Sequence, residues 1–73
     1  MATKQIWVTP HGREWEVKRA GGAAFATTKT QREALERGRD VAREEGAELI
    51  WQGKDGKVVG RSSYGNDPRR SKG

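Results

Sequence analysis

The chain has 73 residues and a net charge of +5, which leaves room for one small domain and excludes a second. Ten residues are Leu, Ile, Val or Phe, about 14% of the chain, so disorder must be considered, but three tryptophans and regular apolar spacing predict a fold. The absence of cysteine excludes a disulfide framework and a thiolate metal site, and we expect a reducing, cytoplasmic setting.

Two short β-rich runs near the N-terminus predict a β-hairpin. They cover Gln5 to Thr9 and Glu14 to Arg19, with a Pro-His-Gly-Arg turn between them. Ile6 and Val8 share the inner face of the first run, which leaves Trp7 outside. The residues before this hairpin lack the apolar core of a signal peptide, and no run approaches the roughly 20 apolar residues of a membrane span.

Residues 20 to 29 predict a connection of small residues, in which Phe25 is an anchor on the core. A helix should follow, because Thr30 is a suitable N-cap with a glutamate three positions later. Apolar residues then recur at helical spacing, and Gly46 is well placed to end the helix. Gly38 lies on the apolar stripe, which indicates close contact between helix and sheet.

Two further runs, Ala47 to Gln52 and Lys57 to Ser62, predict a second hairpin around an Asp-Gly turn. The predicted fold class is α+β with the order ββαββ, two hairpins forming a four-stranded sheet with one helix packed on one face. We expect one domain over residues 1–73, with an ordered core over about residues 5–62 and an irregular basic segment over residues 63–73.

The C-terminal segment concentrates turn-forming residue types directly after the only tyrosine, Tyr64. Arg69, Arg70 and Lys72 follow them. We expect this segment to have a fixed shape that either returns over the domain or presents its basic residues to a partner.

One helix covers one face of a sheet, so the opposite face must meet water, a ligand or another subunit. Trp7 is assigned to that face, with Val59 and either Ile50 or Trp51 nearby. Three alternatives stay open: bulky side chains that merely cover the sheet, a homodimer formed through this face, and stacking of nucleic-acid bases.

The basic excess does not come from the predicted helix, since residues 30–45 hold four arginines and five acidic residues. A DNA-recognition helix would carry a basic surface, so strands, loops and the C-terminal segment would have to contact nucleic acid. For Arg13, Lys18 and Lys54 we favour an ordinary solubilising role, although Lys18 stays among the candidates. The candidate phosphate-binding residues are Lys18, Lys57, Arg61, Arg69, Arg70 and Lys72, and the candidate interface or stacking residues are Trp7, Trp51 and Tyr64.

Residues suited to catalysis are scarce. His11 is the only histidine and lies in a predicted turn, and Ser62 and Ser63 have no evident base beside them. Without cysteine or a second histidine, transition-metal ligation is not expected. The sequence therefore predicts no enzyme, no cofactor, no metal and no membrane partner.

Several short motifs carry a family resemblance. They are Val8-Thr9-Pro10-His11, Trp15-Glu16-Val17-Lys18, Glu45-Gly46-Ala47-Glu48-Leu49, Gly53-Lys54-Asp55-Gly56 and Ser63-Tyr64-Gly65-Asn66-Asp67-Pro68. Together they resemble the small bacterial family catalogued as domain of unknown function 2188, over about Ile6 to Gly73. The resemblance implies a compact α+β domain of bacteria or their phages and brings no established activity to any position. The Arg69-Arg70 pair departs from the family pattern, which permits these arginines only as a feature of this member.

The leading hypothesis is a small non-enzymatic binding module that contacts nucleic acid through basic loops and the C-terminal segment. The alternative is a protein-interaction module that is homodimeric through the uncovered sheet face.

Overall fold

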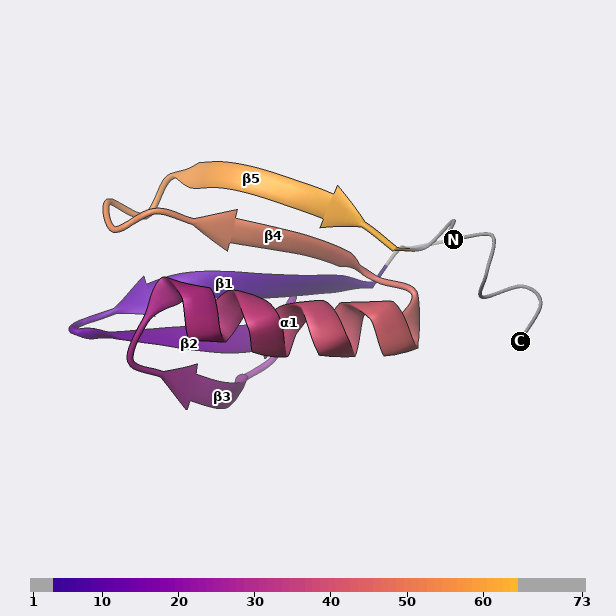
Figure 1. Ribbon diagram of the computed structural model, residues 1–73, viewed down its shortest axis with the longest axis horizontal. Helices are drawn as coiled ribbons and strands as arrows, with labels where there is room; N and C mark the ends of the chain where they lie inside the picture. Colours follow the sequence, from indigo (N-terminus) through magenta and orange to yellow (C-terminus); the bar gives the residue numbers. More distant parts are fainter. Residues whose placement is uncertain (1–3, 65–73) are drawn as a thin grey trace.

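The computed structural model describes residues 4–64, which form a five-stranded sheet with a helix against one face (Figure 1). The elements in chain order are β1 (Gln5–His11), β2 (Glu14–Arg19), β3 (Ala24–Thr28), α1 (Gln31–Glu45), β4 (Glu48–Gln52) and β5 (Val58–Ser63). The strand order in the sheet is β3-β2-β1-β4-β5. β1 and β4 are parallel, because the chain crosses over through α1 between them, and the other neighbours are antiparallel.

The α+β class is confirmed, but the prediction of four strands is wrong. Residues 24–28 form β3, which pairs with β2 at the edge of the sheet instead of serving as a connection. Its small and polar side chains are exposed or half-buried, so the segment lacks the apolar signal of a core strand. Phe25 is not a core anchor, since it is 39% exposed and its ring centroid lies 5.0 Å from the guanidinium of Arg19.

The core lies between α1 and the middle of the sheet. Ile6, Val8 and Val17 are fully buried there, and Leu49 is 1% exposed, as the alternating patterns of the strands predict. Gly38 allows the close approach of the helix, since a Cβ at this position would lie 2.8 Å from Leu49 Cδ1. The predicted contact between Gly38 and the sheet is therefore confirmed.

Local signals fix both ends of the helix and the last turn. Thr30 caps α1 by accepting a hydrogen bond of 3.1 Å from the Glu33 amide to its Oγ1. Gly46 ends the helix with a φ of 65°, a conformation that favours glycine. In the β4–β5 turn the Asp55 carboxylate accepts a hydrogen bond of 3.1 Å from the Lys57 amide.

The helix leaves two parts of the sheet without cover. α1 packs against β1, β2, β3 and β4 but not against β5, and within residues 4–64 no element lies on the reverse face (Figure 1). These two areas and the loops between the strands are therefore the places where a partner could bind. In the described part of the chain, α1 falls short of the length and apolar character that a bilayer span requires.

Candidate functional site

The reverse face of the sheet carries one row of four side chains across neighbouring strands. Strand register places Lys18 beside Trp7, Trp7 beside Ile50, and Ile50 beside Arg61. The row brings two predicted phosphate-binding residues to one face, about 14 Å apart over three strand spacings. The same face also carries acidic residues, which are Glu14, Glu16 and Glu48. The reverse face is therefore mixed in charge and not a basic surface.

Trp7 lies on the reverse face, as predicted, but it is half-buried. Its indole Nε1 donates a hydrogen bond of 3.3 Å to Gln5 Oε1. Ile50, the neighbour of Trp7 on β4, is only 3% exposed. The apolar side chains of this face are therefore only partly accessible.

The three predicted stacking residues do not gather at one place. Trp51 lies on the helix side of the sheet, where it packs against the core, because its strand neighbour Leu49 points the same way. Tyr64 also packs against the core, and its amide donates to the Ala47 carbonyl at 3.1 Å. Only Trp7 belongs to the reverse face.

Basic side chains from three loops meet at the end of the sheet formed by the β1–β2 turn, the β3–α1 loop and the β4–β5 turn. Arg13, Lys29 and Lys54, one from each loop, line a single hollow. An adjoining hollow shares Arg13 and Lys54, and Trp15 lies in both. Among the described residues that line the two hollows, Glu14 is the acidic one. We call this surface the loop end.

The loop end was not assigned as a site from the sequence. The sequence favours a solubilising role for Arg13 and Lys54 and does not single out Lys29, because the three residues are far apart in the chain. The signal available was that each lies in a predicted loop beside a strand or helix end. The predicted residue Lys57 lies in the same β4–β5 turn and is exposed. Arg69, Arg70 and Lys72 lie outside the described residues.

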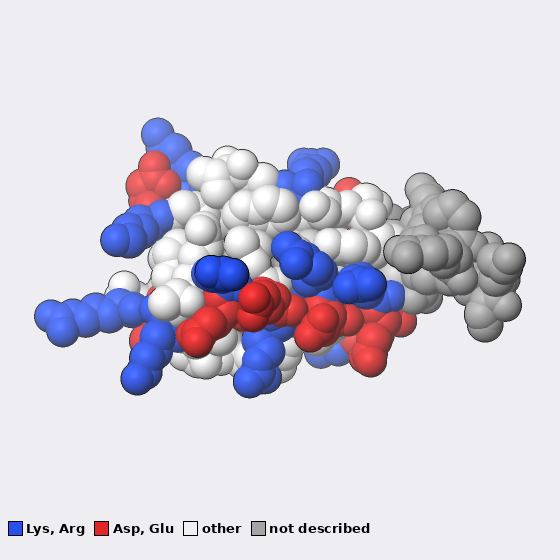
Figure 2. Space-filling view, viewed as in Figure 1, with Lys and Arg blue, Asp and Glu red and all other residues white. Residues whose placement is uncertain are grey.

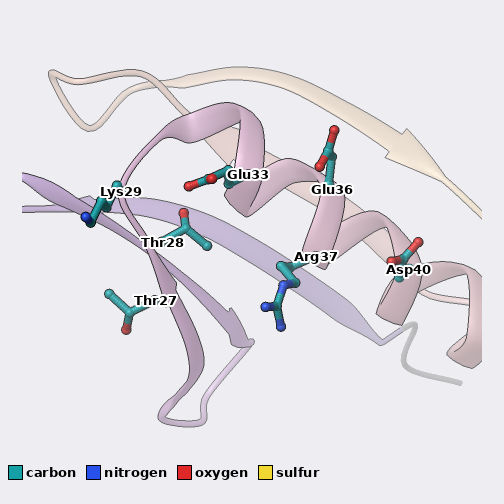
Figure 3. A pocket seen from close by; sticks show the side chains of 7 residues that line it. All are labelled: Thr27, Thr28, Lys29, Glu33, Glu36, Arg37 and Asp40. Atoms are coloured by element: carbon teal, nitrogen blue, oxygen red, sulfur yellow. The ribbon is translucent and has the colours of Figure 1, made fainter.

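A groove between α1 and β3 collects most of the acidic side chains of the helix. Glu33, Glu36, Asp40 and Arg37 line it from α1, and Thr27, Thr28 and Lys29 line it from the β3 side (Figure 3). Glu36 and Asp40 point away from Arg37, so the carboxylates do not converge on a common point (Figure 3). Within residues 4–64 no group of three or more acidic or histidine side chains is arranged to hold a metal ion.

One ion pair joins the far end of α1 to the sheet. The guanidinium of Arg19 on β2 donates to both carboxylate oxygens of Glu45. This hydrogen bonding raises the pKa of Arg19 and lowers the pKa of Glu45. The Arg19 guanidinium therefore already interacts with Glu45 of the helix and with the Phe25 ring. We do not count Arg19 among the candidate ligand-binding residues.

Comparison with known proteins places the chain in a family. No curated protein and no solved structure is detectably similar to it. The family model described as "Uncharacterized protein conserved in bacteria" (DUF2188) matches residues 6–64, from the second residue of β1 to Tyr64. The match ends before Gly65, so residues 65–68 of the terminal stretch expected to share the family pattern lie outside it. The resemblance seen in the sequence is confirmed, and the chain belongs to the bacterial family DUF2188.

Proposed function

We propose that the domain is a non-enzymatic, cytoplasmic module that binds the phosphates of a nucleic acid at the loop end. The observation that supports this proposal is the meeting of Arg13, Lys29 and Lys54 around one hollow. Lysine and arginine neutralise phosphates and release the counterions of a nucleic acid, which gives affinity without choice of sequence. The reverse face is less suited to a polyanion because its acidic residues outnumber its two basic ones.

Basic residues outside the loop-end hollow are proposed as further phosphate contacts. Lys57 lies in the same turn as Lys54 and extends the basic surface along it. In the C-terminal segment, Arg69, Arg70 and Lys72 are proposed as further phosphate contacts, on sequence grounds alone.

The test is the binding of labelled single-stranded DNA, duplex DNA and RNA, measured by fluorescence anisotropy over a range of salt concentrations. The triple variant R13Q/K29Q/K54Q should weaken binding and reduce the slope of log K against log salt by about 2 to 3, because each lost phosphate contact removes about 0.7 to 0.9. The matched control is K18Q/R37Q/R61Q, which removes the same charge from other surfaces. A larger loss in the control, or no binding by the wild-type protein at low salt, would contradict the proposal.

A second candidate function is a homodimer formed through the reverse face. Trp7 and Ile50 form its apolar centre, and Val58 and Val59 are 50% and 60% exposed on the adjoining edge strand. Sedimentation at several concentrations separates the two functions. A dimer that Trp7→Ser dissociates would favour this candidate, and a monomer at all concentrations would reject it.

A further inference from the structure

The charges of α1 are segregated around its axis, although their sum is close to zero. Successive residues are about 100° apart, and Gly38 marks the direction of the sheet. Around the helix axis, three arginines then lie about 100 to 140° to one side of Gly38; they are Arg32, Arg39 and Arg43. The acidic residues fall on the top of the helix and toward its other side; they are Glu33, Glu36, Asp40 and Glu44.

Two contacts of α1 show which side of the helix faces β4 and which faces β3. Gln31 Nε2 donates a hydrogen bond of 2.9 Å to the Gln52 carbonyl on β4, whereas Arg37 lines the groove beside β3. The three arginines are on the same side of the helix as Gln31 and therefore flank β4 and β5. Figure 2 shows basic side chains along this edge of the helix, with a band of acidic ones beside them. We call Arg32, Arg39 and Arg43, which span about 16 Å, the arginine ridge.

Within residues 4–64, the part of the sheet beside the ridge is uncharged and is not covered by the helix. On its helix side β5 presents Gly60 and Ser62, the strand partners of Trp51 and Leu49, and α1 does not cover them. The indole of Trp51 rests on Gly60, where a Cβ would lie 2.3 Å from Cζ2. We take the exposed part of half-buried Trp51 to be the side of the ring that faces away from Gly60. Figure 2 shows this area between the helix and β5 as a broad uncharged surface.

We propose that this surface binds a single-stranded nucleic acid, with one base against Trp51 and the neighbouring phosphates on the arginine ridge. An aromatic ring beside a line of basic groups is the usual means by which proteins hold single strands. Charge complementarity favours this ligand, because the uncharged area has basic residues along its helix border and acidic ones only beyond them. Glu36 lies beside the ridge, and its carboxylate is 4.0 Å from Arg32 Nε in an exposed pair that a phosphate can replace.

A paired base would not reach the ring. Trp51 is half-buried between α1 and β5, so a base must leave its stack to contact it. Gln31 and Gly53 line the loop-end hollow and are chain neighbours of Arg32 and Gln52. The inference rests on the proposed function and extends it, since the same strand would pass from the loop end to the ridge.

The test compares two arginines of the same helix that lie on opposite flanks. R39Q should weaken binding of a labelled oligothymidine and reduce its salt slope by about 0.7, whereas R37Q, with the same charge change, should leave both unchanged. The triple variant R32Q/R39Q/R43Q should reduce the slope by about 2. The affinity for the corresponding duplex should be the same in R39Q, in the triple ridge variant and in the wild-type protein.

Tryptophan fluorescence tests the base contact. Oligothymidine should quench the emission of the wild-type protein and of W7F, and an abasic strand of the same length should not. The quenching should be much weaker in W51F than in W7F, and any that remains would come from Trp15, which lines the loop-end hollows.

Equal effects of R37Q and R39Q, or quenching as strong in W51F as in W7F, would overturn the inference. If binding is lost in R13Q/K29Q/K54Q but unchanged in the ridge variants, the proposed function holds and this inference fails. If the wild-type protein binds no nucleic acid at low salt, both fail.

Discussion

Replacing Gly60 by alanine tests whether the Trp51 ring has the position on which the single-strand surface depends. A Cβ at Gly60 would lie 2.3 Å from Cζ2, 2.5 Å from Cε2 and 2.8 Å from Nε1 of the indole. Carbon atoms in contact are normally about 3.5 to 4.0 Å apart, so the ring must move by more than about 1 Å. Overpacking of this kind costs about 1 to 3 kcal/mol. Alanine in a strand otherwise gains about 0.5 to 1 kcal/mol over glycine, so the middle values of the two ranges give an expected net loss of unfolding free energy of about 1 kcal/mol.

Urea unfolding, followed by fluorescence, measures this loss, and the native emission of Gly60→Ala should shift to longer wavelength as the ring leaves the sheet. The control is the same change in a Trp51→Leu protein, which lacks all three ring atoms. There Gly60→Ala should be neutral or stabilising by up to about 1 kcal/mol. If Gly60→Ala, in the protein that keeps Trp51, is as stable as the wild-type protein, the ring does not lie on Gly60. The argument for an outward-facing indole then fails.

Three further changes test the fold and its pH dependence. Gly38→Ala should lower the unfolding free energy by about 1 kcal/mol, because overpacking against Leu49 exceeds the helix propensity gained; a more stable variant in urea unfolding would contradict this. Thr30→Ala should cost about 1 kcal/mol through loss of the N-cap, while Thr30→Ser should cost much less in the same assay. Because Arg19 lowers the Glu45 pKa from its ordinary value of 4.5, the stability due to the pair is present above that value and is lost as the pH falls through the lower, folded value. Glu45→Gln should therefore lose less stability than the wild-type protein between neutral pH and pH 3, and parallel pH profiles would refute the coupling.

Local patterns predicted the elements of this chain well. Thr30 and Gly46 limit the helix because they satisfy backbone groups at its ends, and such caps depend only on nearby residues. The alternation around Ile6 and Val8 assigned the two faces of β1 correctly, and Trp7 with them. β3 was missed because an edge strand that buries little needs no apolar pattern, and Ala24 to Thr28 have none.

Strand order was beyond the reach of local patterns. β1 is central because β4 returns parallel to it after the helix, and no residue type encodes that pairing. The strand order determines which side chains are neighbours. It brings Lys18 and Arg61 into one row and leaves β5 without contact to the helix. The loop end depends in the same way on three connections that meet only in the folded chain.

The charge of the helix shows why a sum over a segment can mislead. Four arginines and five acidic residues over residues 30–45 argued against the helix as a nucleic-acid contact. A ligand, however, meets one flank of a helix at a time, and salt screens charges beyond about 10 Å, which is close to the width of a helix with its side chains. The flank beside β5 is basic and the flank beside β3 carries acidic residues, so a single strand held near Trp51 would interact mainly with the arginine ridge. Glu36→Gln, which removes the acidic partner of Arg32, should accordingly strengthen binding of an oligothymidine, while Glu33→Gln on the other flank should change it less.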